Sequence, residues 1–387
     1  MDEPRLEIRL INSLNEVSAE EWNAVANPPS ESYDPFLSWQ FLQAMEESGA
    51  ASPETGWAPH HIIIEQAGRG LCGAMPLYLK SHSQGEFVFD HSWADAYERA
   101  GGRYYPKLLS AVPFTPVTGR RRLVRPGPDA ARIGEALLGA AVKIAADNNI
   151  SSLHINFLTG EEALRLDTAG LLIRTDQQFH WKNDGYESFD DFLNALSSAK
   201  RKNLRKERRR AQEGLTFHHI TGSDITEDHW DVFYEFYMDT GARKWGSPYL
   251  NRETFSLLGE RLADDILLIF AEENDEPIAG ALNMIGGDRL LGRYWGTVSA
   301  RPMLHFETCY YQAIDFAIAR GLRTVEAGAQ GGHKLARGYV PETTYSAHWI
   351  AHEGLADAVG EYLGRERQMV EREADFLRER TPFKKDG

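Results

Sequence analysis

The chain has 387 residues, a length that suits two medium-sized domains, each able to bury its own core. Its hydrophobic content of 42% and charged content of 26% are ordinary for a globular protein, and its formal net charge of -15 argues against a general binder of nucleic acid or anionic membranes. Two cysteines without CxxC spacing give no sign of a disulfide scaffold, and no signal core or long apolar stretch occurs, so we expect a cytoplasmic protein without integral membrane association.

Apolar patterning predicts the elements of the first half in chain order. A Ser18-x-x-Glu21 capping box marks the first helix, and a polar turn separates the two strands of a hairpin. An aromatic-rich insertion at 92–124, broken by three prolines, is expected to be a loop folded over a cleft. The elements expected are strand 6–11, the helix after Ser18, helix 37–47, hairpin 61–80, strand 87–90, the insertion, helix 129–148, and strands 151–157 and 171–181.

A polar patch at 183–188 predicts the domain boundary, giving a first domain at 1–183 and a second at 184–387. The second domain is expected to contain basic helix 198–212, helices 227–240 and 252–262, hairpin 268–287, strand 290–295, helix 305–320, and strands 324–327 and 345–350. The apolar spacing over 355–377 predicts a long amphipathic helix at the end.

The two halves contain the same unit. Residues 61–80 and 268–287 both read as an apolar run, a polar turn and a second apolar run carrying Gly-Ala, and residues 141–157 match residues 313–329. A repeat of this length is one supersecondary unit used twice. We therefore expect an α/β fold of two tandem domains, each a mixed twisted sheet flanked by helices.

The second copy carries a glycine-rich polar segment that the first copy lacks. The segment Gly328–Tyr339, GAQGGHKLARGY, follows a strand, whereas the first copy has Asn156-Phe-Leu-Thr-Gly at the corresponding position. Glycines allow a backbone to approach a ligand closely, and the polar side chains offer acid, base and anion-binding groups. The alternative is a solvated glycine-rich loop. The candidate residues are Gln330, His333, Lys334, Arg337 and Tyr339.

The strand before it ends in Arg293-Tyr294-Trp295-Gly296, and a helix is expected to begin at His305, where free N–H groups can bind an anion. Arg293-x-x-Gly296 is similar to the loop that cradles a pyrophosphate in the GNAT N-acyltransferase superfamily, with Val298 in place of the final small residue. Tyr294 and Trp295 could equally be core residues.

Taken together, the doubled series of hairpin, strand, helix and strand resembles the Fem-type aminoacyltransferases. Almost the whole chain resembles a bacterial family of Fem-related, GNAT-like proteins. That resemblance rests on residues 104–119, 200–210, 292–296 and 305–314 and on the glycine-rich segment. It implies a doubled GNAT fold and transfer of an acyl or aminoacyl group to an amine. The helical arm of some Fem enzymes is absent, which argues against dependence on tRNA.

The run from Lys200 to Arg210 has eight basic residues and one acid, Glu207. Such a helix can seat a phosphate-rich partner such as tRNA, a CoA nucleotide or a lipid-linked precursor, or it can be a solvated surface balanced by acids elsewhere. Its candidate residues are Arg201, Arg205, Arg208 and Arg209. Lys244 and Trp245 could border an acceptor pocket or end a helix.

These patterns predict an N-acyltransferase, with acyl-CoA or aminoacyl-tRNA as the donor and cell-wall precursors among the possible acceptors. We expect His333 to be the base, with Glu326 as the alternative, and Lys334, Arg337 and Arg293 to hold phosphate or carboxylate. No motif indicates a metal or a tightly bound cofactor. The competing hypotheses are a non-catalytic module that binds a peptidoglycan-like or nucleotide ligand, and an RNA-associated protein.

Overall fold

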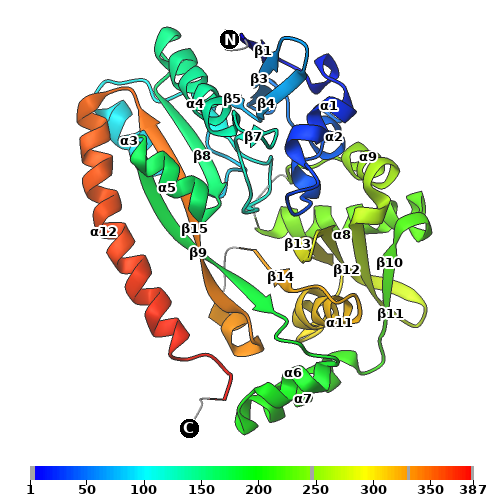
Figure 1. The fold of residues 1–387 in the computed structure, drawn as a ribbon. Helices are drawn as coiled ribbons and strands as arrows, with labels where there is room; N and C mark the ends of the chain where they lie inside the picture. The colour runs from blue at the N-terminus through cyan, green and yellow to red at the C-terminus, as the bar shows by residue number, and fades with distance from the viewer. Residues whose placement is uncertain (1–4, 245–247, 329–331, 385–387) are drawn as a thin grey trace. The chain divides into compact units, whose positions relative to one another are not determined.

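The computed structural model describes residues 5–244, 248–328 and 332–384. The chain divides into two compact units, and each contains β-sheet flanked by helices (Figure 1). Unit 1 comprises Met1–Asp176 and Thr343–Val370, and unit 2 comprises Gln177–Glu342 and Glu371–Gly387. Strands β9 (Leu172–Lys182) and β15 (Val340–Ile350) and helix α12 (Glu353–Arg378) each contribute residues to both units.

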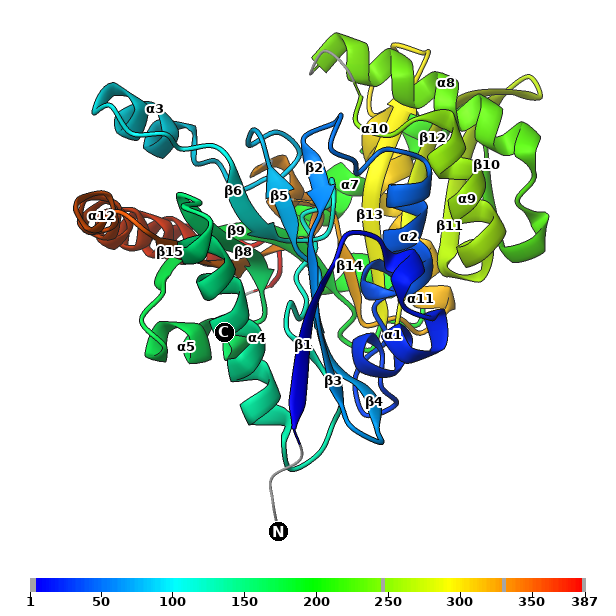
Figure 2. The same cartoon turned by 90° about the horizontal axis from the view of Figure 1, so that it is seen from above.

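Unit 1 has two sheets, with strand orders β1-β3-β4-β7 and β15-β8-β6-β5-β2. Helix α4 packs on β3, β4, β7 and β8, where Ile133, Leu137 and Ala141 are buried (Figure 2). Its elements are β1 (Leu6–Ile11), α1 (Ala19–Ala26), α2 (Trp39–Glu47), β2 (Trp57–Pro59), β3 (His61–Gln66), β4 (Gly70–Met75), β5 (Tyr78–Lys80), α3 (His91–Arg99), β6 (Lys107–Ser110), β7 (Leu123–Val124), α4 (Ala130–Asp147), β8 (Ser152–Leu158) and α5 (Gly160–Thr168).

Unit 2 has one sheet, ordered β10-β11-β12-β13-β14-β9, in which only β13 and β14 run parallel among the pairs described. Helices α8 and α11 cover opposite faces (Figures 1 and 2). Its elements are α6 (Phe189–Ala195), α7 (Ser198–Gln212), β10 (Thr216–Thr221), α8 (Glu227–Lys244), α9 (Arg252–Leu262), β11 (Ile266–Glu273), β12 (Glu276–Gly286), β13 (Arg289–Thr297), α10 (Leu304–Phe306), a π-helical turn η5 (Glu307–Tyr311), α11 (Gln312–Ala319), β14 (Thr324–Glu326) and a 3-10 helix η6 (Gly332–Arg337).

Successive side chains of β11 point to opposite faces of this sheet, and apolar side chains on both faces explain why helices cover both. Leu267 and Ile269 lie in the cluster on the α11 side, while the Phe270 ring contacts the Phe236 ring of α8. Because both sides are apolar, the strand is buried from Ile266 to Ala271 and needs a helix on each face.

The repeat predicted from the sequence is present in the strand pairing. The antiparallel series β1-β3-β4 corresponds to β10-β11-β12, and the parallel pair β6–β8 corresponds to β13–β14. The last antiparallel strand is exchanged: β15 pairs with β8 in unit 1, and β9 pairs with β14 in unit 2. The compact units therefore differ from the expected division at residue 183, because each repeat gives its final strand to the other unit's sheet.

The insertion at 92–124 does not form the expected loop over a cleft. It contains most of α3 and all of β6 and β7, and β6 is a buried strand between β5 and β8. Trp93 and Tyr104 lie in a core cluster with residues of α12. The strand expected at 87–90 is also wrong, since Asp90 precedes α3. Phe87 has a φ of 58°, in the left-handed region that a regular strand does not use. A buried ion cluster explains why β6 was not predicted: the Lys107 ammonium bonds Glu86 and Asp90, at 2.8 Å and 2.5 Å, so a charged residue stands inside this buried strand.

A histidine pair joins β8 to β15 beside this ion cluster. His154 and His348 are opposite each other in the ladder, and their Nδ1 atoms are 2.7 Å apart. One nitrogen must donate and the other must accept, so two neutral rings satisfy the contact. Burial lowers the pKa of His154 to about 3 and that of His348 well below its usual range.

This pair predicts a loss of stability in acid. Below an unfolded-state pKa of 6.5, the unfolded chain binds protons that the folded rings do not, so the free energy of unfolding falls as the pH drops toward 3. His348→Gln should reduce that slope by up to about 1.4 kcal/mol per pH unit, as measured by urea unfolding at several pH values. Burial also raises the pKa of Glu86 to about 7, and that shift makes the free energy of unfolding rise as the pH drops. Because Glu86 is present in both the wild type and His348→Gln, its contribution cancels in the comparison. His91→Gln, at an exposed histidine, is the control; a slope unchanged in His348→Gln would contradict the prediction.

Candidate active site

His333 lies on η6, the short helix after β14 in unit 2. Its ring is exposed, and its Nε2 is 3.1 Å from the Tyr310 hydroxyl. Partial burial, followed by the positive charges of Arg337 and Lys334, lowers the pKa of His333. The imidazole is therefore neutral near pH 7. The tautomer in which Nε2–H donates to Tyr310 leaves the Nδ1 lone pair available, which is what a general base requires.

The two cations on the same short helix contact the protein itself. Lys334 is buried, and its ammonium donates to the carbonyl oxygens of Ala327 and Gly328, at 2.6 Å and 3.0 Å. Burial lowers the pKa of Lys334 to about 8. Arg337 forms a two-pronged pair with Glu207 of α7. Both side chains thus fix the backbone that carries His333, rather than extending toward solvent as the sequence prediction of ligand-binding cations implied.

Glu326, the alternative base, is buried at the end of β14. Its carboxylate pairs with Arg289 at 3.0 Å and with Arg293 at 3.4 Å. Burial alone would raise the pKa of Glu326, but His180, Arg289 and Arg293 together lower it. A carboxylate held ionised by two guanidinium groups is a poor proton acceptor. The geometry thus favours His333 over Glu326 as a candidate base, and it places Arg293 in an internal ion pair.

The segment compared with a pyrophosphate loop is part of strand β13. The Tyr294 ring contacts the Tyr237 ring of α8, and the Trp295 ring lies 5.0 Å from that of His305. The helix expected at His305 starts as a three-residue turn, α10, that runs into the π-helical turn. Arg293-x-x-Gly296 therefore does not form a loop, and these side chains pack within unit 2.

Gly296 has a packing role that predicts a large stability effect. A Cβ at this position would lie 2.1 Å from the carbonyl oxygen of Phe236 in α8. Gly296→Ala must push helix and strand apart, and overpacking of this kind costs about 3 kcal/mol. Gly364→Ala, on α12 where a Cβ meets no atom within 4 Å, should instead gain about 0.5 to 1 kcal/mol from helix propensity. Chemical unfolding of the two variants checks the contrast, and equal effects would contradict it.

Of the other predicted site residues in this region, one is a core residue and the rest lie wholly or partly outside the described residues. Tyr339 is fully buried in the core of unit 2, with its hydroxyl 3.4 Å from the Tyr310 carbonyl oxygen. Gln330 and Trp245 lie outside the described residues, as does the side chain of Lys244, the last residue of α8.

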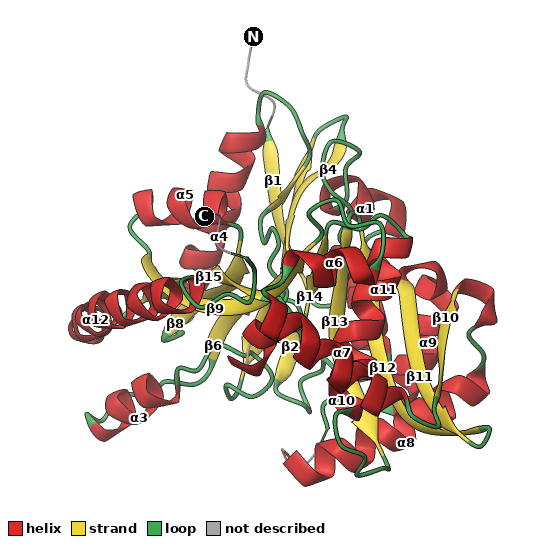
Figure 3. Cartoon of the chain, turned by 90° about the horizontal axis from the view of Figure 1, so that it is seen from below, coloured by secondary structure: helices red, strands yellow, loops and turns green. Residues whose placement is uncertain are grey.

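Helix α7 has the expected bounds and lies beside α6 (Figure 3). Arg208 pairs with Glu307 and Asp315, and its guanidinium lies 4.1 Å from the centre of the Phe189 ring. Arg205 pairs with Asp190 at 2.9 Å. Arg205 and Arg208, both predicted to contact a phosphate ligand, are thus already paired with carboxylates of unit 2. Arg209 is exposed and Arg201 is half-buried.

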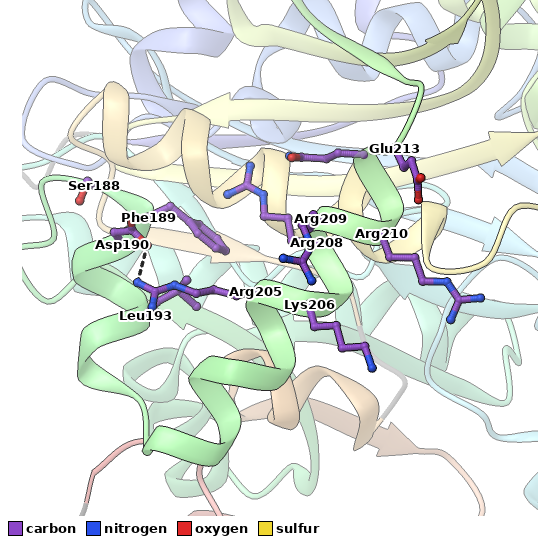
Figure 4. Close-up of a pocket in the computed structure, with 11 residues that line it drawn as sticks. Ser188, Phe189, Asp190, Leu193, Arg205, Lys206, Arg208, Arg209, Arg210 and Glu213 are labelled. Atoms are coloured by element: carbon purple, nitrogen blue, oxygen red, sulfur yellow. Dashed lines mark hydrogen bonds and ion pairs between the residues drawn. The ribbon is translucent and has the colours of Figure 1, made fainter.

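A hollow of about 1040 Å³ lies between α6 and α7. Figure 4 shows Arg205 reaching Asp190, and Lys206 and Arg210 extending from the same side of α7. Lys206, Arg209 and Arg210 are exposed, and no carboxylate pairs with them among the described residues. Beside the hollow, these three cations are open to an anion. The hollow is lined by Ser188, Phe189, Asp190, Leu193, Arg205, Lys206, Arg208, Arg209, Arg210, Gln212 and Glu213.

The structure also brings in residues that sequence reasoning did not select. Tyr310 holds the His333 ring, and Glu207 joins α7 to η6 through Arg337. Glu207 had one visible signal, as the only acid in the basic run. Tyr310 lies within the segment 305–314 that carries the family resemblance, but nothing in that segment singled it out from its neighbours. Over the described part of the chain, no group of three or more His, Cys, Asp or Glu side chains could hold a metal ion, and no helix is long and apolar enough to cross a membrane.

The chain belongs to the FemAB-like family, described as peptidoglycan biosynthesis/recognition, which it matches over residues 13–385. The predicted relationship to Fem proteins is thereby confirmed. No curated protein matches the chain.

Solved structures show the same fold at low sequence identity. FemX is 14% identical with a TM-score of 0.55, over 91% of this chain and 100% of that one. The C-terminal domain of a putative lysylphosphatidylglycerol synthetase from Agrobacterium fabrum is 9% identical with a TM-score of 0.56, over 89% and 96%. L-PGS from Bacillus licheniformis is 11% identical with a TM-score of 0.51, over 86% and 98%. The expected fold class, a mixed α/β fold built from two GNAT-like units, is confirmed.

Proposed function

We propose that the protein is an N-acyltransferase that moves an acyl or aminoacyl group from a phosphate-rich carrier to an amine, with its reacting groups in unit 2. The observation that carries this proposal is the exposed, neutral His333 imidazole, fixed by Tyr310 on a segment anchored by Lys334. A proton acceptor held in one orientation is the group that such a reaction needs.

In the proposed reaction the acceptor amine attacks the carbonyl carbon of the donor. A new C–N bond forms, and the C–O bond of an ester donor, or the C–S bond of a thioester, breaks. His333 takes the proton that the nitrogen loses, and the released carrier oxygen or sulfur accepts a proton in turn. Tyr310 keeps the ring oriented; burial raises its pKa, so its hydroxyl stays protonated.

Two features support a carrier rich in phosphate. Lys206, Arg209 and Arg210 form an exposed basic surface in a chain of net charge -15, and α7 joins the His333 segment directly through Glu207 and Arg337. Acyl-CoA and aminoacyl-tRNA share this phosphate chemistry. The family description, peptidoglycan biosynthesis/recognition, supports cell-envelope precursors as the acceptors.

The test is transfer of a labelled group under matched conditions with two donors. Aminoacyl-tRNA charged with a labelled amino-acid mixture, and labelled acetyl-CoA, are each incubated with a peptidoglycan-precursor peptide that carries a free amine. We expect a new amide on the acceptor, identified by mass spectrometry, with one donor only. No product with either donor would contradict the proposal for these substrates, and product formed equally by His333→Gln would exclude its mechanism.

A second candidate is a binding module without catalysis. It is favoured by the internal pairing of Arg293, Lys334 and Arg337, since cations held by the protein do not hold a donor. Such a module would bind the precursor peptide with the same affinity in wild type and His333→Gln, and would form no product in either.

A further inference from the structure

Helix α7 has different chemistry on its two sides. Lys206, Arg209 and Arg210 are exposed, whereas Leu204 and Ala211 are buried in unit 2. Residues three and four apart share one face of a helix, so the exposed cations form one stripe and the two apolar residues mark the other side. The single acid of the basic run, Glu207, belongs to the apolar side, because it lies three residues after Leu204 and four before Ala211.

The Glu207 carboxylate accepts three hydrogen bonds, all from groups outside α7. Arg337 donates from Nε to Oε1 and from Nη2 to Oε2, each at 2.9 Å, and the Tyr311 hydroxyl donates to Oε1 at 2.6 Å. The side chains of Glu207 and Arg337 are 19% and 8% exposed, so water weakens this pair little. One carboxylate thus joins α7, η6 and the π-helical turn.

Arg337, held by Glu207, in turn contacts His333 and its surroundings. Its Nη1 donates to the His333 carbonyl oxygen at 2.7 Å, and its guanidinium lies 3.4 Å from the centre of the Phe306 ring. The His333 ring also contacts that phenyl ring, with centroids 5.4 Å apart. Arg337 therefore constrains the His333 backbone by a hydrogen bond, and it constrains the His333 ring through the Phe306 ring that both side chains contact.

Glu207 also anchors, through Tyr311, the turn that carries the hydrogen-bond partner of His333. The neighbour of Tyr311 in the π-helical turn, Tyr310, is the residue that bonds the imidazole Nε2. Because Glu207 bonds Tyr311, the same carboxylate anchors both the segment that carries His333 and the turn that carries its hydrogen-bond partner.

We infer that Glu207 is a positioning residue for acyl transfer, holding His333 and Tyr310 in register through Arg337 and Tyr311. This role rests on the proposed function and adds to it a residue that touches neither donor nor acceptor.

The test compares two carboxylates with the same surroundings. Glu366 of α12 accepts a two-pronged pair from Arg174 at 2.8 Å and 2.7 Å and a hydrogen bond from the Tyr362 hydroxyl at 2.8 Å. Glu207→Gln and Glu366→Gln therefore remove equivalent interactions, but only the first lies beside η6. Glu366→Gln controls for any general loss of stability.

Hydrogen exchange gives a readout that is independent of activity. In full-length Glu207→Gln, amide exchange over residues 332–337 should accelerate about tenfold relative to wild type. Glu366→Gln should leave that segment unchanged. Unchanged exchange in Glu207→Gln would overturn the positioning role, whether or not the protein is active.

Kinetics gives the second readout. Because a misplaced base acts on the transition state, Glu207→Gln should lower kcat by about 100-fold and change the Kd of the donor by less than about twofold. Glu207→Asp, which keeps the charge, should recover part of the loss. Faster exchange with an unchanged kcat would overturn the positioning role and leave the proposed function standing. Absence of turnover in the wild type would overturn the proposed function, and the role of Glu207 with it.

Discussion

Replacing His333 with glutamine should lower kcat by at least about 100-fold with the donor that the wild type uses. A general base contributes roughly 10² to 10⁴ in rate, and glutamine can hydrogen-bond Tyr310 but cannot take a proton at neutral pH. The Kd of the donor should change little, because the lost interaction occurs only in the transition state. Steady-state kinetics with a separate binding measurement checks both halves of the expectation.

A matched histidine separates this effect from a loss of stability. His218 of β10 is in the same unit, is exposed and pairs with Glu272 on a neighbouring strand. His218→Gln should keep wild-type kcat. A His333→Gln enzyme with more than about half of the wild-type kcat would remove the histidine from the reaction and would turn attention to Lys334, the other nearby group with a lowered pKa.

The pH profile provides a further check on the assignment. A base must be deprotonated to act, so kcat/KM should fall on the acid side as His333 gains a proton. Partial burial and the charges of Arg337 and Lys334 place the pKa of His333 below its ordinary value, and the acid limb should therefore lie below pH 6.5. An acid limb above that value would indicate a different group.

Much of the fold could be predicted because it depends on local patterns and on their repetition. Ser18 does cap α1, with its hydroxyl accepting from the Glu21 amide at 3.3 Å and donating to the Glu21 carboxylate at 2.7 Å, and α7 has its predicted bounds. The Gly-Ala positions that marked the repeat fall in corresponding strands, β4 and β12. Patterns with periods of two and of 3.6 residues survive in a single sequence because each element buries one face.

The exchange of β9 and β15 could not be predicted, since either strand would suit either sheet by its own pattern. Strand β6 was missed for a different reason. Its Lys107 is fully buried, and only the tertiary contacts with Glu86 and Asp90 make a charged residue acceptable there.

The candidate site was predicted by residue type but not by pairing. The basic helix and the glycine-rich segment were both predicted as candidate sites, yet no pattern in either one indicates that Glu207 and Arg337 bond each other. A charge-rich run reads as a surface available to a ligand until the structure shows which members the protein itself pairs. Arg208 is the example, because Glu307 and Asp315 already hold it.

Neutralising the exposed cations of α7 should weaken donor binding by about 100-fold at low salt. The variant is Lys206→Gln, Arg209→Gln and Arg210→Gln combined, chosen because these side chains are exposed and pair with no carboxylate among the described residues. A cation that contacts phosphate releases bound counterions, so each lost contact lowers the slope of log Kd against log salt by roughly 0.7 to 0.9. Loss of all three should therefore flatten the slope by about 2 to 3.

The control must change the charge of the protein equally without touching α7. Arg69, Arg99 and Lys143 are exposed residues of unit 1, and their combined replacement by glutamine makes the same change in net charge. If long-range attraction alone favours the donor, both triple variants should lose affinity alike. If α7 contacts the phosphates directly, only its own variant should lose affinity and salt dependence, while kcat at saturating donor stays near that of the wild type because His333 is unchanged. Equal affinity of the α7 variant and the wild type at low salt would show that this helix face is only solvated surface.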